Sequence, residues 1–193
     1  MDWKLTKPFI LASQSPRRQE ILRLVELPFE LEIPSDFSEF TSSEISDPET
    51  LAWENAKGKA QEIARKHQKA LVLGVDTIVE IDGKILGKPV DEKDALRMLK
   101  LLSGKTHTVW TGMHLIDTET KQEQRCIEKT QVTFLDVDDE TLARYIQTGE
   151  PMDKAGAYAV QGIGALYIRG IEGDFFNVMG LPVYRLRQML MEF

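Results

Sequence analysis

The sequence predicts an α/β fold in which a mixed β-sheet is flanked by helices. Segments typical of strands, either wholly apolar or alternating between apolar and polar residues, recur along the chain. Segments whose apolar residues repeat at helical spacing lie between them. The 193 residues can bury one sizeable core or two small lobes, and no change of composition marks a boundary between independent domains. We therefore expect a single domain over residues 1–193, with two lobes around a central cleft.

The N-terminal half carries clear local signals for its elements. Proline is favoured at the first position of a helix, and an Asp-Gly pair between apolar runs is a hairpin signal. The expected elements are a strand at 9–12, a helix from Pro16 to about Val25, a strand at 29–33, a helix from about Pro48 to Lys66, strand segments at 71–75 and 77–81, and a turn at Asp82-Gly83.

The C-terminal half continues the alternation. Asp91 and Asp138 precede amphipathic segments as helix caps, and Gly104 follows the first of these segments. The apolar residues of each helix share one face. The expected elements are a helix from Asp91 to Gly104, strands at 107–116 and 129–135, a helix starting at Asp138 with Leu142, Tyr145 and Ile146 inside, a strand from Ala165 to Arg169, and a terminal helix from Pro182.

Composition excludes several classes of function. The formal net charge of -7 argues against a general binder of nucleic acid or of anionic membranes. The single cysteine, Cys126, excludes an intramolecular disulfide and a cysteine-based zinc site, which fits a reducing cytoplasm. No apolar run approaches the ~20 residues that span a bilayer, and MDWKLTKP lacks the apolar centre of a signal peptide. We expect a cytoplasmic protein whose phosphate-binding groups, if any, form a local cluster.

The stretch LASQSPRRQEIL, residues 11–22, combines features of an anion site. Ser15 is a natural N-cap for a helix that begins at Pro16, and the positive end of a helix dipole favours anions. Arg17 and Arg18 add two guanidinium groups whose geometry suits phosphate or carboxylate. The same pattern also fits a capped surface helix with solvated arginines.

An acidic segment and a lysine at an apolar position come next in the chain. Residues 30–54 contain eight acidic residues and no basic one, which fits either a solvated loop or a loop that offers a metal ligand. Lys59 lies within the apolar stripe formed by Ala52, Ala56, Ala60 and Ile63 of the next helix. A lysine at such a position must extend to solvent or pair with an anion.

Asp76 lies within the most apolar run of the sequence, between LVLGV and TIVEI. A carboxylate inside such a strand is unfavourable unless it is paired, hydrogen-bonded or bound to a metal. A functional role and a structural role in capping a turn both satisfy this requirement. No phosphate loop of the G-x-x-x-x-G-K-[ST] type and no G-x-S-x-G elbow is present. His67, His107 and His114 show no zinc-site spacing, so we expect structural or exposed histidines.

Five segments together resemble one known family. LASQSPRRQEIL, VLGVDTIVEIDGKILGKP, LLSGKTHTVWTG, GEPMDKAGAYAVQG and VMGLPV occur in the order and at the spacing of the Maf family of nucleoside triphosphate pyrophosphatases. The resemblance covers nearly the whole chain. It implies an elongated Maf/ITPase-like fold with a deep cleft, a metal-dependent hydrolysis of a nucleoside triphosphate to the monophosphate and pyrophosphate, and often a homodimer.

The resemblance also assigns roles to residues. It implies that Asp76 is the general base for water attack on the α-phosphorus. Ser13, Arg17 and Arg18 match the family's phosphate loop, and Lys59 and Lys88 match its two phosphate-facing lysines. A divalent cation, Mg²⁺ or Mn²⁺, would bridge phosphate oxygens, with Glu39 and Asp76 as its candidate ligands.

The same segments indicate the substrate branch. Arg17 after the proline and DKAGAY at 153–158 resemble the branch that acts on dTTP and UTP, with modified pyrimidine triphosphates as further substrates. The resemblance implies that Arg18, Thr77 and Gln161 select the base. A glutamine amide offers one donor and one acceptor, which matches the N–H and carbonyl of uracil and thymine.

Two alternatives stay open at this point. One is a pyrophosphatase for 7-methyl-GTP or for a broad range of damaged nucleotides. The other is a nucleotide-binding regulator of cell division or septation with weak catalysis, a role that the family resemblance suggests. The expected partner is in each case a nucleoside triphosphate, with neither nucleic acid nor membrane, and a homodimer is compatible with all three.

Overall fold

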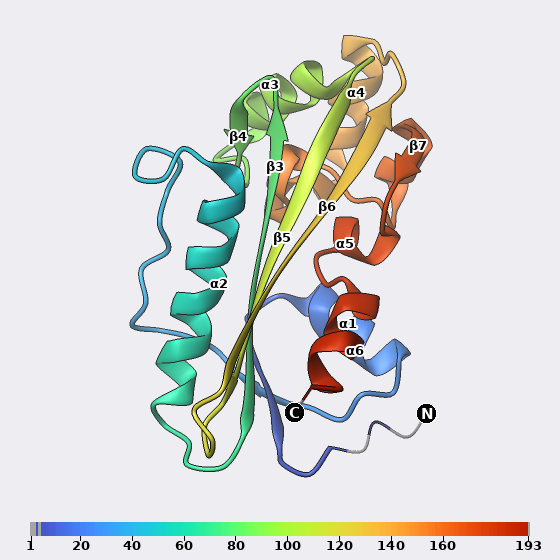
Figure 1. Ribbon diagram of the computed structural model, residues 1–193. Coiled ribbons are helices and arrows are strands. Elements are labelled where there is room, and N and C mark those ends of the chain that lie inside the picture. The colour runs from blue at the N-terminus through green and yellow to red at the C-terminus, as the bar shows by residue number, and fades with distance from the viewer. Residues whose placement is uncertain (1–2, 4, 193) are drawn as a thin grey trace. The chain divides into compact units, whose positions relative to one another are not determined.

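The computed structural model describes residue 3 and residues 5–192, and its strands form a mixed sheet with helices beside it (Figure 1). Residues 1, 2, 4 and 193 lie outside this range. The first three belong to MDWKLTKP, the stretch that we expect not to be a signal peptide. Within the described part, seven strands pair in the order β2-β1-β3-β5-β6-β7, and β4 pairs with β3. Their bounds are β1 (Phe9–Ala12), β2 (Glu30–Glu32), β3 (Leu71–Ile81), β4 (Lys84–Leu86), β5 (Thr106–Asp117), β6 (Glu123–Phe134) and β7 (Ile168–Glu172).

The chain divides into two compact units. The first unit comprises Met1–Asp76, Thr111–Glu128 and Gly180–Phe193, and the second comprises Thr77–Trp110 and Lys129–Met179. Three of the four boundaries fall inside β3, β5 and β6, so each of these strands contributes residues to both units, and the fourth follows Met179. The two compact units agree with the expected pair of lobes, whereas the cleft and the single domain stay predictions.

The first unit places parallel strands between helices. β1 pairs in parallel with β2 and with β3. Helix α2 (Pro48–Ala64) lies on one side of these strands, and α1 (Pro16–Leu24) and α6 (Val183–Leu190) lie on the other (Figure 1). One buried cluster of this unit joins β1, α2 and β3 through Ile10, Ala12, Ile63, Ala70 and Val72.

Two glycines let α2 approach the strands closely. A Cβ atom on Gly74 of β3 would lie 2.0 Å from the backbone oxygen of Ala56 in α2. A Cβ atom on Gly112 of β5 would lie 2.5 Å from the backbone oxygen of Ala52, in the same helix. Both separations are far shorter than a van der Waals contact, so any side chain at either glycine would push against the helix backbone.

The second unit has its own core. The hairpin of β3 and β4 turns at Asp82 and Gly83, whose φ angles of 51° and 73° are those of the turn that Asp-Gly favours. Helix α3 (Glu92–Leu102) packs against α4 (Asp139–Gln147) and against the short 3₁₀ helix η2 (Ala155–Ala157). The buried side chains include Leu99, Leu102, Phe134, Tyr145 and Tyr158.

Most expected elements are confirmed, although the strand expected at 129–135 already begins at Glu123, and the larger differences lie after residue 149. The strand expected from Ala165 to Arg169 begins only at Ile168, because Ile163–Tyr167 forms the 3₁₀ helix η3. The sequence pattern also missed η1 (Glu150–Asp153) and α5 (Phe175–Met179). Within the part of the chain that the structure covers, no helix is long and apolar enough to cross a membrane.

His107 makes the stability of the folded chain dependent on pH. Its side chain is 2% exposed, and its Nε2 lies 2.8 Å from the hydroxyl of Tyr158. Burial lowers the pKa of His107 to about 4, whereas an unfolded histidine titrates near 6.5. As the pH falls from about 6.5 to about 4, the unfolded state therefore binds a proton that the folded state does not bind, and the folded state loses stability.

We expect wild type to lose more stability than His107→Gln between pH 7.5 and pH 4.5. The difference should be no more than ~3 kcal/mol, which corresponds to the depressed pKa. Urea unfolding of both proteins at the two pH values measures it. An equal loss of unfolding free energy in the two proteins would show that His107 does not carry this pH dependence.

Candidate functional site

The ammonium group of Lys59 lies between two carboxylates. Lys59 Nζ is 2.7 Å from Oδ1 of Asp76 and 2.8 Å from Oε1 of Glu39. Lys59 comes from α2, Asp76 from the part of β3 in the first unit, and Glu39 from the connection between β2 and α2. Lys59 and Asp76 are each 8% exposed, whereas the Glu39 side chain is about half exposed. The buried lysine in the apolar stripe thus pairs with the buried aspartate. Pairing with an opposite charge was one of the options expected for each of the two residues.

Asn55, one turn before Lys59 in α2, connects Asp76 to the acidic segment. Its Nδ2 donates to Oδ2 of Asp76 at 3.3 Å and to the carbonyl of Phe40 at 3.2 Å. Its Oδ1 accepts from the backbone N–H of Phe40 at 2.8 Å. The side chain is 3% exposed. One buried amide therefore fixes both the carboxylate of Asp76 and the residue that comes after Glu39.

Glu62 holds the other end of the same segment. Its carboxylate accepts from the backbone N–H groups of Ser35, Asp36 and Phe37, at 2.9, 3.1 and 2.8 Å. Burial opposes the ionised form, but these three donors together with Lys66 outweigh it and hold the pKa of Glu62 below its usual value.

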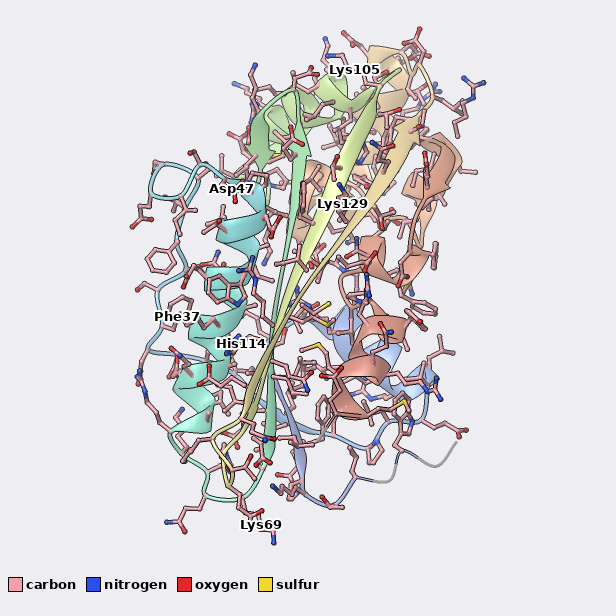
Figure 2. All side chains as sticks on the ribbon, in the orientation of Figure 1. Phe37, Asp47, Lys69, Lys105, His114 and Lys129 are labelled. Atoms are coloured by element: carbon pink, nitrogen blue, oxygen red, sulfur yellow. The ribbon has the colours of Figure 1, made fainter. Side chains whose placement is uncertain are left out.

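Aromatic packing adds to this attachment. The ring of Phe37 lies against Gly58 of α2, where an added Cβ would come within 2.2 Å of the ring (Figure 2). Residues 35–40 are therefore attached to α2 by Glu62 at their start and by Asn55 at their end.

The phosphate-loop candidates form a second, adjoining part of the first unit. Ser13 Oγ accepts from the backbone N–H of Ser15 at 3.2 Å and from Nη1 of Arg18 at 3.0 Å. Nε of Arg18 donates to the carbonyl of Gly180 at 2.8 Å. Ser15 occupies the N-cap position of α1, but its side chain makes no capping hydrogen bond. Because Ser13 Oγ already accepts two hydrogen bonds, its own proton suits donation to an acceptor such as a phosphate oxygen.

Arg18 is a buried cation close to the carboxylates. It is 8% exposed, and burial lowers its pKa to about 10, so it stays charged at neutral pH. Asp76 and Glu39 act in the opposite direction on this pKa, and Arg17 acts in the same direction as burial. Electrostatic interaction thus joins Arg18 to the carboxylates that pair with Lys59, and Arg17 lies close enough to Arg18 to repel it.

The remaining predicted site residues belong to the second unit. Thr77 comes directly after Asp76 in β3 and is partly buried. Lys88 is exposed and lies beyond the end of β4, where the carbonyl of Gly87 accepts from the backbone N–H of Gly156. Gln161 is exposed in a bend between η2 and η3. The structure therefore groups Ser13, Arg17, Arg18, Glu39, Lys59 and Asp76 in the first unit, and Thr77, Lys88 and Gln161 in the second.

The donor set around Lys59 fits a divalent cation of the magnesium type. Such ions are usually held by one or two carboxylates, and substrate phosphates and water complete the shell. Glu39 and Asp76 each place one carboxylate oxygen against Lys59 Nζ, so a metal ion bound by both side chains would share them with Lys59. No group of three or more histidine, cysteine or acidic side chains that could hold a metal occurs among the described residues. A cation here would therefore depend on phosphate oxygens as well as protein.

The histidines have structural partners, as expected. His67 Nε2 lies 2.6 Å from Oε1 of Glu32. His114, labelled in Figure 2, has Nε2 at 2.9 Å from Oε2 of Glu123, and its Nδ1 accepts from the indole of Trp53. With the bond between His107 and Tyr158, each imidazole has at least one hydrogen-bond partner.

Asn55 and Glu62 are the site residues that the sequence did not reveal. A usable signal was present, because residues 55, 59 and 62 are spaced four and three apart and so share one face of a helix. The other buried residues of this helix are leucine, alanine and isoleucine. A row of polar side chains on a buried face indicates partners that the helix alone does not provide.

Known proteins resemble this chain over nearly its full length. Residues 8–193 match the family profile described as Maf-like protein. A dTTP/UTP pyrophosphatase of Alkaliphilus oremlandii is 50% identical over 185 residues, which cover 95% of this chain and 95% of the relative. One of Ruminiclostridium cellulolyticum is 49% identical over 181 residues, which cover 94% of this chain and 93% of the relative.

Among solved structures, one titled "Structure of a HAM1 protein from Coxiella burnetii" aligns with 97% of this chain and 100% of that chain, at 14% identity and a TM-score of 0.49. The family assignment rests on the sequence matches. The profile spans almost the entire sequence, and relatives about half identical to it align over nearly their full lengths. The chain belongs to the Maf family.

Proposed function

We propose that the protein hydrolyses dTTP and UTP, together with modified pyrimidine triphosphates, to the monophosphate and pyrophosphate. The observation that carries this proposal is the pairing of Lys59 with Asp76 and Glu39 beside the buried Arg18. The relatives named dTTP/UTP pyrophosphatase, 49% and 50% identical to this chain, support the choice of substrate.

Asp76 is the proposed general base. Its carboxylate is held by Lys59 at one oxygen and by Asn55 at the other, so its orientation is fixed before substrate binds. A carboxylate fixed in this way can accept a proton from a water molecule within hydrogen-bond reach. The water oxygen then attacks the α-phosphorus, the bond to the bridging oxygen breaks, and pyrophosphate leaves.

The cations of the site match the charge of a triphosphate. Arg17, Arg18, Lys59 and Lys88 supply positive charge, and Ser13 supplies a hydroxyl donor. These groups stabilise the negative charge that develops on the leaving pyrophosphate. Glu39 and Asp76 would hold Mg²⁺ or Mn²⁺, which when bound neutralises phosphate oxygens and lowers the pKa of a bound water.

Base selection is proposed for Arg18, Thr77 and Gln161. The amide of Gln161 can pair with the N–H and carbonyl of thymine or uracil, whereas cytosine presents a different donor and acceptor pattern. A wrong base would leave polar groups unpaired, which gives strong discrimination. We further propose a cytoplasmic location, which the single, partly buried Cys126 suits, and a homodimeric assembly.

Pyrophosphate release from a panel of triphosphates tests the function. The panel comprises dTTP, UTP, CTP, GTP, ATP, ITP and 7-methyl-GTP, each with Mg²⁺, with Mn²⁺ and with a chelator. We expect turnover of dTTP and UTP that is at least about tenfold faster than turnover of CTP and that stops with the chelator. Preference for 7-methyl-GTP would contradict the proposed substrates but would support the proposed release of pyrophosphate. Binding without turnover of any triphosphate would favour a regulator.

A further inference from the structure

The carboxylate of Glu150 holds one side of the bend that carries Gln161. Its Oε2 accepts from the backbone N–H of Ile163 at 2.9 Å, and its Oε1 accepts from the backbone N–H of Gly164 at 2.9 Å. Burial opposes the ionised form, but these N–H donors outweigh it and hold the pKa of Glu150 below its usual value. The carboxylate thus fixes the chain two and three residues after Gln161.

Tyr145 of α4 extends the same network to the other side of the bend. Its hydroxyl donates to Oε1 of Glu150 at 2.7 Å and accepts from the backbone N–H of Ala159 at 3.2 Å. The side chain is 1% exposed, so the hydroxyl is held by the core of the second unit. One phenol and one carboxylate therefore connect the chain before Gln161 to the chain after it.

Two glycines make this close approach possible. A Cβ atom on Gly162 would lie 2.4 Å from Oε2 of Glu150, and a Cβ atom on Gly164 would lie 2.6 Å from the hydroxyl of Tyr145. The backbone can reach the two polar groups only because both positions lack a side chain. Lys154 Nζ also donates to the carbonyl of Glu150 at 2.7 Å, which ties Glu150 to the segment that precedes the bend.

We propose that Glu150 is a positioning residue for base selection, acting with Tyr145 to hold residues 159–164 so that Gln161 presents its amide in one orientation. This inference rests on the proposed function, since it assigns the reading of the base to Gln161. Glu150 touches the backbone around Gln161 and acts through it. Its removal should change which base is accepted more than the rate at which the bound triphosphate is hydrolysed.

The test compares wild type with Glu150→Gln and Tyr145→Phe. The glutamine can accept at only one of the two oxygen positions, and the phenylalanine removes only the hydroxyl. We expect the ratio of kcat/KM for dTTP to that for CTP to fall about tenfold in both variants, through KM, while kcat for dTTP changes less than about threefold. Glu140→Gln, a highly exposed carboxylate on α4, is the matched control and should equal wild type.

A double-mutant cycle separates positioning from a general effect on the fold. In a Gln161→Ala background, Glu150→Gln and Tyr145→Phe should change the dTTP to CTP ratio no further, because the group that they orient is gone. Equal losses for all triphosphates, or effects that add to that of Gln161→Ala, would overturn the proposal. If Glu150→Gln does not fold, as thermal melting would show, Tyr145→Phe carries the same test.

The same data distinguish failure of the function from failure of this inference. Wild type that does not prefer dTTP over CTP contradicts the proposed substrate. The cycle is then measured with the triphosphate that wild type favours and the nearest analogue of that triphosphate. Non-additivity with Gln161→Ala supports the positioning role in that case too, and additivity overturns it.

Discussion

The substitution Asp76→Asn is expected to lower kcat for pyrophosphate release from dTTP by about 10³-fold. The carboxamide is not basic, so it cannot take the proton from the attacking water. It also has one oxygen in place of two, and can accept from Lys59 or from Asn55 but not from both. Nucleotide binding should persist, because the cations around the site remain and one negative charge near the phosphates is removed.

Rates of pyrophosphate release and nucleotide titrations of wild type and Asp76→Asn measure both parts of this prediction. Glu80→Gln makes the same chemical change on the same strand, where the carboxylate accepts from the backbone N–H of Gly83 in the hairpin. This control should keep the activity of wild type. An Asp76→Asn protein with wild-type kcat would remove Asp76 from the role of base.

Alanine at Gly74 or at Gly112 is expected to give the largest loss of stability, ~3 kcal/mol for either substitution. The added methyl group would meet the backbone of α2 at Ala56 or Ala52, and a helix backbone cannot rotate away as a flexible side chain can. The strands and α2 would have to separate, and the buried alanines between them would lose contacts. Gly170→Ala is the matched control, since an added Cβ there has no neighbour within 4 Å.

Thermal and urea unfolding of the three alanine variants check this prediction. The melting temperatures of Gly74→Ala and Gly112→Ala should fall by roughly 10 °C, and that of Gly170→Ala should stay close to wild type. If Gly74→Ala and Gly170→Ala unfold at the same temperature, α2 can move away from β3 without loss, and the close packing does not limit stability.

Local sequence patterns predicted the parts of the fold that depend on interactions between residues close together in the sequence. The Asp82-Gly83 hairpin and the helix that begins at Pro48 can each be inferred from a few neighbouring residues, whereas the apolar stripe left two options open for Lys59. The start of the strand expected from Ala165 to Arg169 was wrong, because a carboxylate distant in the sequence binds the chain just before it. Glu150 binds the N–H groups of Ile163 and Gly164, and the chain forms a 3₁₀ helix there in place of a strand.

In the candidate site, too, some residues could be predicted from their sequence neighbours and others could not. Lys59 and Asp76 stood out because a charge in an apolar pattern demands a partner, and the structure pairs them with each other. The residues that support them did not stand out. Asn55 and Glu62 bind backbone groups of residues 35–40, a segment without any periodic pattern. Their spacing on one buried face therefore indicates that partners exist but not which residues these partners are. The catalytic and ligand roles assigned by resemblance stay predictions, which the kinetics of Asp76→Asn and the metal dependence of turnover test.

The three polar residues Asn55, Lys59 and Glu62 all extend from α2, which has a consequence for how this chain can change in evolution. A single inserted residue advances a helix by 1.5 Å and rotates the remainder of that helix by about 100°. An insertion between Leu51 and Asn55 would therefore turn all three side chains away from Asp76 and from the acidic segment at once. The chemistry on the inner face of α2 therefore fixes the spacing of residues 51–62 along this helix.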